Sequence, residues 1–167
     1  SVAAHKRVLE TAAELFAVRG MDANSMDAIA EGSGVSKATI YKHWPDKDAL
    51  CLEVLGYVHG LDEEFPEFDT GDFRADLIAR LTYERTETRK ELKDKLWPHL
   101  MAYSAKNHAF GQAWRARVME PARQGVADVL ARGQREGVLR KGIDRNVAEA
   151  LLLGPTLYRH IFLKELG

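Results

Sequence analysis

The stretch that decides the fold is NSMDAIAEGSGVSKATIYKHWPDKDAL, which covers residues 24–50. Within it, Ala30 is small enough to let a second helix cross close by, and Gly34 can take the positive φ that a tight turn requires. The apolar side chains expected to fill the angle between the two helices are Ile29, Val35 and Ile40. This pattern predicts a helix-turn-helix, whose second helix enters a DNA major groove.

Helical periodicity also dominates the rest of the chain, and the sequence contains no alternating strand pattern. Residues 62–72 are acidic and are interrupted by proline and glycine, which predicts a boundary between two lobes. We therefore expect an all-α protein with a helix-turn-helix domain over 1–48, the start of a connecting helix over 46–60 and a helical bundle over 61–167. The expected helices cover residues 3–19, 26–32, 36–43, 46–60, 73–95, 96–104, 111–136 and 145–166.

Composition places the chain among ordinary globular proteins. Its 167 residues are 46% apolar and 29% charged, and no apolar run approaches the roughly 18 residues of a membrane span. The single cysteine, Cys51, rules out an internal disulfide and fits a reducing compartment. With no signal peptide in the sequence, we expect a cytoplasmic protein that has no membrane partner.

The net charge of the chain argues against a nucleic-acid partner. The net charge is −1, and residues 1–60 carry six Lys or Arg against eight Asp or Glu. This balance favours an alternative, a helical ligand-binding or scaffold protein that does not bind DNA. The distribution favours DNA binding, because Lys37, Lys42 and Lys47 gather around the expected groove-entering helix.

Motifs for catalysis or metal binding are absent from the sequence. It contains no glycine-rich phosphate loop, nucleophile elbow or paired-carboxylate motif, so we expect neither an enzyme nor a cofactor. His59, His99, His108 and Cys51 do not have the spacing of metal ligands, so we expect no metal site.

Two segments resemble the DNA-binding domain of the TetR family of bacterial transcription regulators: AAELFAVRG at 12–20 and SMDAIAEGSGVSKATIYKHWPDKDAL at 25–50. The segment GQREGVLRKGIDRNVAEALLLGPTLY at 133–158 is similar to the family's looser second lobe. The resemblance implies a homodimer that binds double-stranded, palindromic operator DNA, usually as a repressor released by a small-molecule effector. It also implies that the second lobe serves ligand binding and dimerisation.

The helix at 36–43 carries most of the expected DNA contacts. Lys37 lies near its start, where side chains reach base edges or phosphates, and the resemblance implies a phosphate contact for the Tyr41 hydroxyl. Helix starts at Ser25 and Lys47 offer free N–H groups to phosphates. The alternatives are a solvated Lys37, a buried Tyr41 and a Ser25 that only caps its helix. The predicted DNA-binding residues are Ser25, Ser36, Lys37, Ala38, Thr39, Tyr41, Lys42, His43 and Lys47.

Residues after 60 are rich in aromatic side chains and methionine, which helical bundles use to line ligand pockets or to fill cores. The resemblance favours a pocket, with Tyr103, His99 or Arg117 as polar partners. The predicted ligand-binding residues are Leu61, Leu77, Leu81, Trp97, Leu100, Met101, Tyr103, Trp114 and Val118. Basic residues between 115 and 145 predict a solvated face, or alternatively a surface that attracts an anionic effector.

The last expected helix is apolar on more than one side, so it needs two partners. One side can meet its own lobe and the other a second subunit related by a two-fold axis. The alternative is complete burial within a monomer. The predicted dimer-interface residues are Leu151, Leu152, Pro155, Tyr158, Ile161 and Phe162.

Overall fold

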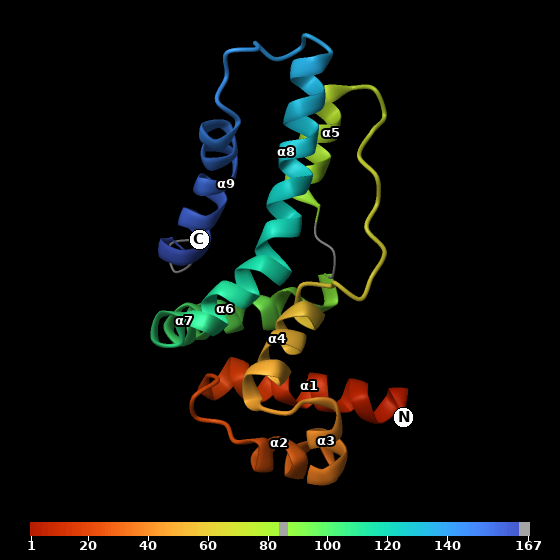
Figure 1. The fold of residues 1–167 in the computed structure, drawn as a ribbon, viewed down its shortest axis with the longest axis vertical. Coiled ribbons are helices and arrows are strands. Elements are labelled where there is room, and N and C mark those ends of the chain that lie inside the picture. The colour runs from red at the N-terminus through yellow and green to blue at the C-terminus, as the bar shows by residue number, and fades with distance from the viewer. Residues whose placement is uncertain (84–86, 164–167) are drawn as a thin grey trace. The chain divides into compact units, whose positions relative to one another are not determined.

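The computed structural model describes residues 1–83 and 87–163, and every regular element in these ranges is helical (Figure 1). The predicted all-α fold class is therefore confirmed. The elements are α1 (Val2–Arg19), α2 (Met26–Ser33), α3 (Lys37–His43), α4 (Lys47–Val58), α5 (Phe73–Thr82), the 3₁₀ turn η1 (Glu87–Arg89), α6 (Lys90–Lys106), α7 (His108–Trp114), the π-helical turn η2 (Arg115–Met119), α8 (Glu120–Arg135) and α9 (Arg145–Phe162).

Polar caps and one glycine set the boundaries of α2 and α3. The Ser25 side chain accepts a hydrogen bond from the amide of Ala28, and the Ser36 side chain accepts one from Thr39, so each helix start has a bonded donor. Gly34 ends α2 with φ 65° and ψ 20°, the left-handed conformation predicted for the turn. The local sequence thus fixes the angle at which α3 leaves α2.

The described residues form two compact units, and each is described by itself. The first contains residues 1–63 and 87–118, and the second contains residues 64–83 and 119–163. This division differs from the predicted lobes of 1–48 and 61–167, because α6 packs against α1 and α4 and α7 packs against α4. The residues that bury these surfaces lie far apart in the sequence, so helical periodicity alone did not reveal the pairing.

The first unit is built around α1, which packs against α2, α4 and α6 (Figure 1). Val8, Ala12 and Phe16 on α1 are fully buried. Asn24 is buried in the turn that follows, and its side-chain amide donates to the carbonyls of Leu15 (3.0 Å) and Gly20 (2.7 Å). These bonds satisfy a buried polar group and fix the turn that leads into α2.

Helix boundaries between residues 73 and 106 differ from the prediction. A single helix over 73–95 and another over 96–104 were expected, but α5 ends at Thr82 and α6 runs unbroken from Lys90 to Lys106. Pro98 lies inside α6 and does not end it. Leu96, Trp97 and Leu100 are buried around the proline, so their packing outweighs the lost backbone hydrogen bond.

The second unit joins α5 and α9 to α8, and α5 lies beside α8 in Figure 1. Asp76 on α5 is almost fully buried, accepts hydrogen bonds from the amide and hydroxyl of Thr70, and pairs with Arg132 on α8. Burial raises the pKa of Asp76, but the Thr70 hydrogen bonds and the Arg132 guanidinium outweigh it and hold the pKa below its usual value. Within the described ranges, none of the helices is long and apolar enough to span a membrane.

Candidate nucleic-acid interface

One face of α3 is polar and open to solvent. Lys37, Ala38, Tyr41, Lys42 and His43 are exposed, and Thr39 is half-buried. Tyr41 keeps 49% of its surface exposed, so the alternative in which it fills the helix angle is wrong. The opposite face is closed by the buried side chains of Ile40, as predicted, and of Trp44, which follows α3. The structure thus places the predicted DNA-contacting side chains of α3 together above an apolar base.

Lys37 does not stand alone at the start of α3. Its ammonium lies 2.7 Å from the carboxylate of Asp27 on α2, and both side chains are mostly exposed. An ion pair this exposed contributes about 0–1 kcal/mol and exchanges readily. This ion pair could not be predicted from the sequence, because the contact depends on how α2 and α3 cross.

Ser25 and Ser36 are exposed at the starts of α2 and α3, where both act as N-caps. The Ser25 hydroxyl is 3.1 Å from the amide of Ala28, and the Ser36 hydroxyl is 3.2 Å from that of Thr39. Each hydroxyl still has a proton to donate, although the Ser36 proton also has the Thr39 hydroxyl within 2.9 Å. Capping and a phosphate contact are therefore compatible at Ser25.

Lys47 lies at the start of α4 but is tied into the first unit. Its ammonium donates to the carbonyl of Met21 at 2.9 Å and lies 5.8 Å from the centre of the Tyr103 ring. The Tyr103 hydroxyl in turn donates to Asp48 at 2.6 Å. The structure thus links the start of α4 to the end of α1 and to α6, and it does not present Lys47 as a free charge.

A carboxylate on α4 fixes the end of α3. Glu53 accepts a 2.6 Å hydrogen bond from the Trp44 indole and lies 2.6 Å from the His5 ring nitrogen. The His5 ring lies against Trp44 (4.6 Å between centroids) and meets His43 edge-on (5.3 Å). The sequence pattern does not reveal that His5 and Glu53 meet here, because the cluster joins three separate helices.

Family comparisons agree with this geometry. Residues 8–54 match the model described as bacterial regulatory proteins, tetR family, and residues 67–166 match the tetracyclin repressor-like C-terminal domain. The uncharacterized HTH-type transcriptional regulator YdeS of Bacillus subtilis is 31% identical over 156 residues, covering 93% of this chain and 77% of YdeS. The DNA-binding transcriptional repressor TetR of Mycobacteroides abscessus is 30% identical over 149 residues, covering 87% of this chain and 77% of the repressor.

The chain belongs to the TetR family. This TetR-family protein is a DNA-binding transcriptional regulator, which agrees with the sequence prediction. Its fold is also similar to that of a Rhodococcus protein described as a TetR-family transcriptional regulator. The TM-score is 0.74 at 22% identity, over 96% of this chain and 88% of that one.

The ligand-binding residues predicted for this TetR-family chain do not share one unit. Leu61, Trp97, Leu100, Met101, Tyr103, Trp114 and Val118 belong to the first unit, whereas Leu77 and Leu81 belong to the second. Trp97 and Trp114 meet edge-to-face with centroids 6.0 Å apart, and Tyr103 meets Phe110 in the same way at 4.9 Å. Most of the first-unit group is buried, which fits the core-filling alternative.

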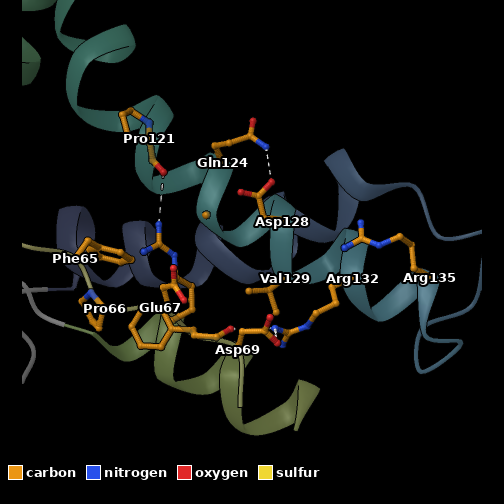
Figure 2. Close-up of a pocket in the computed structure, with 13 residues that line it drawn as sticks. Phe65, Pro66, Glu67, Asp69, Pro121, Gln124, Asp128, Val129, Arg132 and Arg135 are labelled. Carbon is orange, nitrogen blue, oxygen red and sulfur yellow. Dashed lines mark hydrogen bonds and ion pairs between the residues drawn. The ribbon is translucent and has the colours of Figure 1, made fainter. Parts of the chain in front are cut away.

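Both units contain cavities. One in the second unit measures about 630 Å³ and lies between the segment at 65–69 and α8. Figure 2 shows Gln124 hydrogen-bonded to Asp128 at one edge of this cavity, with Asp69, Val129 and Arg132 at another. One cavity in the first unit measures about 440 Å³ and is lined by Leu61 and by Arg117, one of the three candidate polar partners, but by none of the other predicted ligand-binding residues.

The apolar stripe predicted for dimerisation lies on α9. Leu151 (70%), Tyr158 (56%) and Phe162 (67%) are largely exposed, and the Tyr158 and Phe162 rings lie 5.3 Å apart. Pro155 is exposed and Leu152 is half-buried, while the side chain of Ile161 lies outside the described part of the structure. Complete burial within one subunit, the alternative for this helix, is therefore wrong. Among the described residues, no group of three or more His, Cys, Asp or Glu is placed to hold a metal ion.

Proposed function

We propose that this TetR-family regulator is a cytoplasmic homodimeric repressor that binds a palindromic double-stranded operator through α3 and is released by a small-molecule effector. The observation that carries the DNA-binding mode is the exposed polar face of α3 above the buried Ile40 and Trp44. A helix presented in this way fits a major groove and leaves its side chains free to meet base edges and phosphates. Repression is supported by the name of the M. abscessus relative.

Specific contacts follow from where each side chain lies. Lys37, at the first position of α3, is proposed to leave Asp27 for a base edge or a phosphate. Tyr41, about half of whose surface is exposed, is proposed to donate its hydroxyl proton to a phosphate. Ser25 keeps its proposed phosphate contact, whereas Lys47 is proposed to position the start of α4, because its ammonium is held by Met21.

The homodimer is supported by the exposed apolar stripe of α9. Leaving the large apolar side chains at 151, 158 and 162 in water is unfavourable. A second subunit related by a two-fold axis presents the same stripe and can cover them. A dimer also places two α3 helices on one duplex, which is the arrangement that a palindrome requires. We propose an interface formed by Leu151, Leu152, Pro155, Tyr158, Ile161 and Phe162.

Selection of bound DNA from a random pool, followed by fluorescence anisotropy on the selected site, tests the proposal. We expect a palindrome with half-sites about one helical turn apart. Tyr41→Phe should weaken binding about tenfold to a hundredfold for each lost hydrogen bond to a charged phosphate, and Lys37→Ala by at least as much. Lys141→Ala, an exposed lysine of the second unit, is the matched control and should bind like the wild type.

The competing function is a helical ligand-binding or scaffold protein without DNA binding. It would be supported if folded wild-type protein enriched no sequence and bound random and selected duplexes equally weakly. Enrichment of a site with no internal symmetry would instead contradict the dimeric mode.

A further inference from the structure

The cavity of the first unit has an apolar floor and a charged rim. It measures about 440 Å³ and lies between α1 and α4, with Leu9, Gly56 and Leu61 contributing apolar surface. His5 and Lys6 line it from α1, Glu53 and Tyr57 from α4, and Asp62, Arg89 and Arg117 complete it. A space of this kind suits a small molecule with an apolar body and a polar end.

Most charges around this cavity are already paired. His5 lies 2.6 Å from Glu53, and Lys6 lies 3.7 Å from Glu10. Arg89 pairs with Asp62 at 2.7 Å, donates to the carbonyl of Tyr57, and stacks on the Tyr57 ring at 3.7 Å. The His5–Glu53 and Arg89–Asp62 pairs join separate segments of the cavity wall and have little charge left for a ligand. The exposed Lys6–Glu10 pair lies within α1 and is weak.

Arg117 is the exception. Throughout residues 1–83 and 87–163, no carboxylate or hydrogen-bond acceptor pairs with its guanidinium, although the side chain lines the cavity. Arg117 also occupies the middle of the π-helical turn η2, and single π turns inside helices are frequent at functional sites. A guanidinium presents two parallel N–H donors that match a carboxylate or sulfonate.

We propose that this cavity binds an amphipathic monoanion, a carboxylate with an aliphatic or aromatic body, whose apolar part covers Leu9, Gly56 and Leu61 and whose carboxylate pairs with Arg117. Burial of the apolar body supplies most of the affinity, and the ion pair fixes the orientation. The site lies in the unit that carries α3, and of the residues predicted for ligand binding it contains Leu61 and the candidate polar partner Arg117.

The walls of this cavity are connected to α3. His5 and Glu53 line it, and the same two side chains hold the Trp44 indole and the His43 ring at the end of α3. A ligand that touches His5 and Glu53 therefore favours particular positions of Trp44 and, through it, of α3. This step rests on the proposed function, because it requires operator binding through α3. If the monoanion lowers the affinity for operator by some factor, operator lowers the affinity for the monoanion by the same factor.

Isothermal titration calorimetry of the full chain with decanoate tests the site itself. Wild-type protein should bind decanoate, Arg117→Gln should weaken binding about tenfold or more, and Leu61→Trp, which fills the floor, should abolish it. Arg115→Gln is the matched control, because Arg115 lies on the same turn but does not line the cavity. Circular dichroism verifies that each variant is folded. Because Arg117 is exposed, we expect Arg117→Gln to disturb the fold less than Leu61→Trp.

The outcomes separate this site from the proposed function. Equal decanoate affinity in wild type, Arg117→Gln and Arg115→Gln, or no binding at all, overturns the site, whether or not the protein binds its operator. Loss of binding in Arg117→Gln alone supports it. Operator anisotropy with and without decanoate then tests the coupling: unchanged operator affinity in saturating decanoate overturns the connection to α3, whereas a loss that Arg117→Gln prevents supports it.

Discussion

The pair formed by Lys37 and Asp27 places a negative charge beside the start of α3, the helix that we propose enters the DNA groove. The two charged groups are 2.7 Å apart, and about 60% of each side chain is exposed. DNA binding then either breaks the pair or brings a carboxylate close to phosphates, and both reduce affinity. An acidic side chain at this place is one way in which a regulator of net charge −1 limits binding to unrelated DNA.

Asp27→Asn is therefore expected to tighten DNA binding. Affinity for random duplex should rise about threefold to tenfold at low salt, because Lys37 is released and a repulsive charge is removed. Fluorescence anisotropy measures the change. Glu91→Gln removes the same charge from an exposed pair with Lys95 on α6 and serves as the control. Equal affinities for the Asp27 variant and the wild type would show that the pair does not compete with DNA.

Asp76 is expected to make the second unit sensitive to acid. Its pKa is held below the usual value, so its carboxylate contributes stability above about pH 4 that is lost as pH falls through the lowered folded-state pKa. Asp76→Asn should lower the melting temperature at pH 7, because Arg132 loses a buried, charged partner. The melting temperature of the variant should also decline less steeply between pH 5 and pH 2, because this carboxylate is no longer there to be protonated. Thermal unfolding followed by circular dichroism at several pH values measures both effects.

An exposed carboxylate in the same unit provides the comparison for Asp76. Asp128→Asn removes a charge from α8 at a position open to solvent, where Gln124 is its hydrogen-bond partner. It should leave both the melting temperature at pH 7 and the steepness of the acid decline close to wild type. If the Asp76 variant declined in acid as steeply as the wild type, another carboxylate would be responsible.

Residue roles in the helix-turn-helix could be predicted where they depend on neighbours in the sequence. The positive φ of Gly34, the burial of Ile40 and the exposure of Tyr41 all follow from turn chemistry and the 3.6-residue period. The role of Lys47 could not be predicted in this way. Its ammonium binds the carbonyl of Met21 and faces the Tyr103 ring, and those contacts exist only after α1, α4 and α6 pack.

At the scale of elements, the crossing of α5 and α8 depends on a glycine. A Cβ at Gly133 would lie 2.4 Å from the Phe73 ring, closer than any side chain tolerates without movement. The Gly133 position thus allows the ring at the start of α5 to lie against the backbone of α8. Sequence analysis included this glycine in a long helix and found no reason for it, because the neighbour that needs the space is 60 residues away.

Gly133→Ala is expected to destabilise the protein despite improving helix propensity. Overpacking costs about 1–3 kcal/mol and the propensity gain is about 1 kcal/mol, so the net loss is up to about 2 kcal/mol. In a Phe73→Ala background the same substitution should be neutral or stabilising, because the clash is gone. Urea denaturation of the four proteins measures the coupling. Gly142→Ala, with no atom within 4 Å of the new Cβ, should not destabilise.

Helix ends proved harder to predict than helix existence. The order of helices and the ends of α1 to α3 follow the sequence within a residue or so, since caps and glycines mark them. Between 73 and 106 the prediction placed a helix end at 95, yet α6 runs unbroken from Lys90 to Lys106 with Pro98 inside it. Packing of α6 on α1 decides that segment, and no local pattern carries this information.

At the scale of the whole molecule, DNA affinity and dimerisation are expected to change together. Leu151, Tyr158 and Phe162 form an exposed apolar stripe on α9, so a charge placed in it opposes pairing of two copies. Leu151→Glu should shift the protein from dimer to monomer in analytical ultracentrifugation. A monomer offers one α3 to the operator, so the affinity should fall by several orders of magnitude even though every DNA-contacting residue is unchanged.

Salt dependence counts the phosphates that each form meets. If each subunit neutralises about four phosphates, the logarithm of dimer affinity should fall with the logarithm of salt concentration at a slope near −7. The Leu151→Glu monomer should give a slope near −3.5, because half of the contacts remain. Anisotropy titrations from about 50 to 200 mM salt measure both slopes. Equal slopes for the two proteins would mean that the second subunit never reaches the duplex, and a slope near zero would exclude a phosphate-based mode for α3.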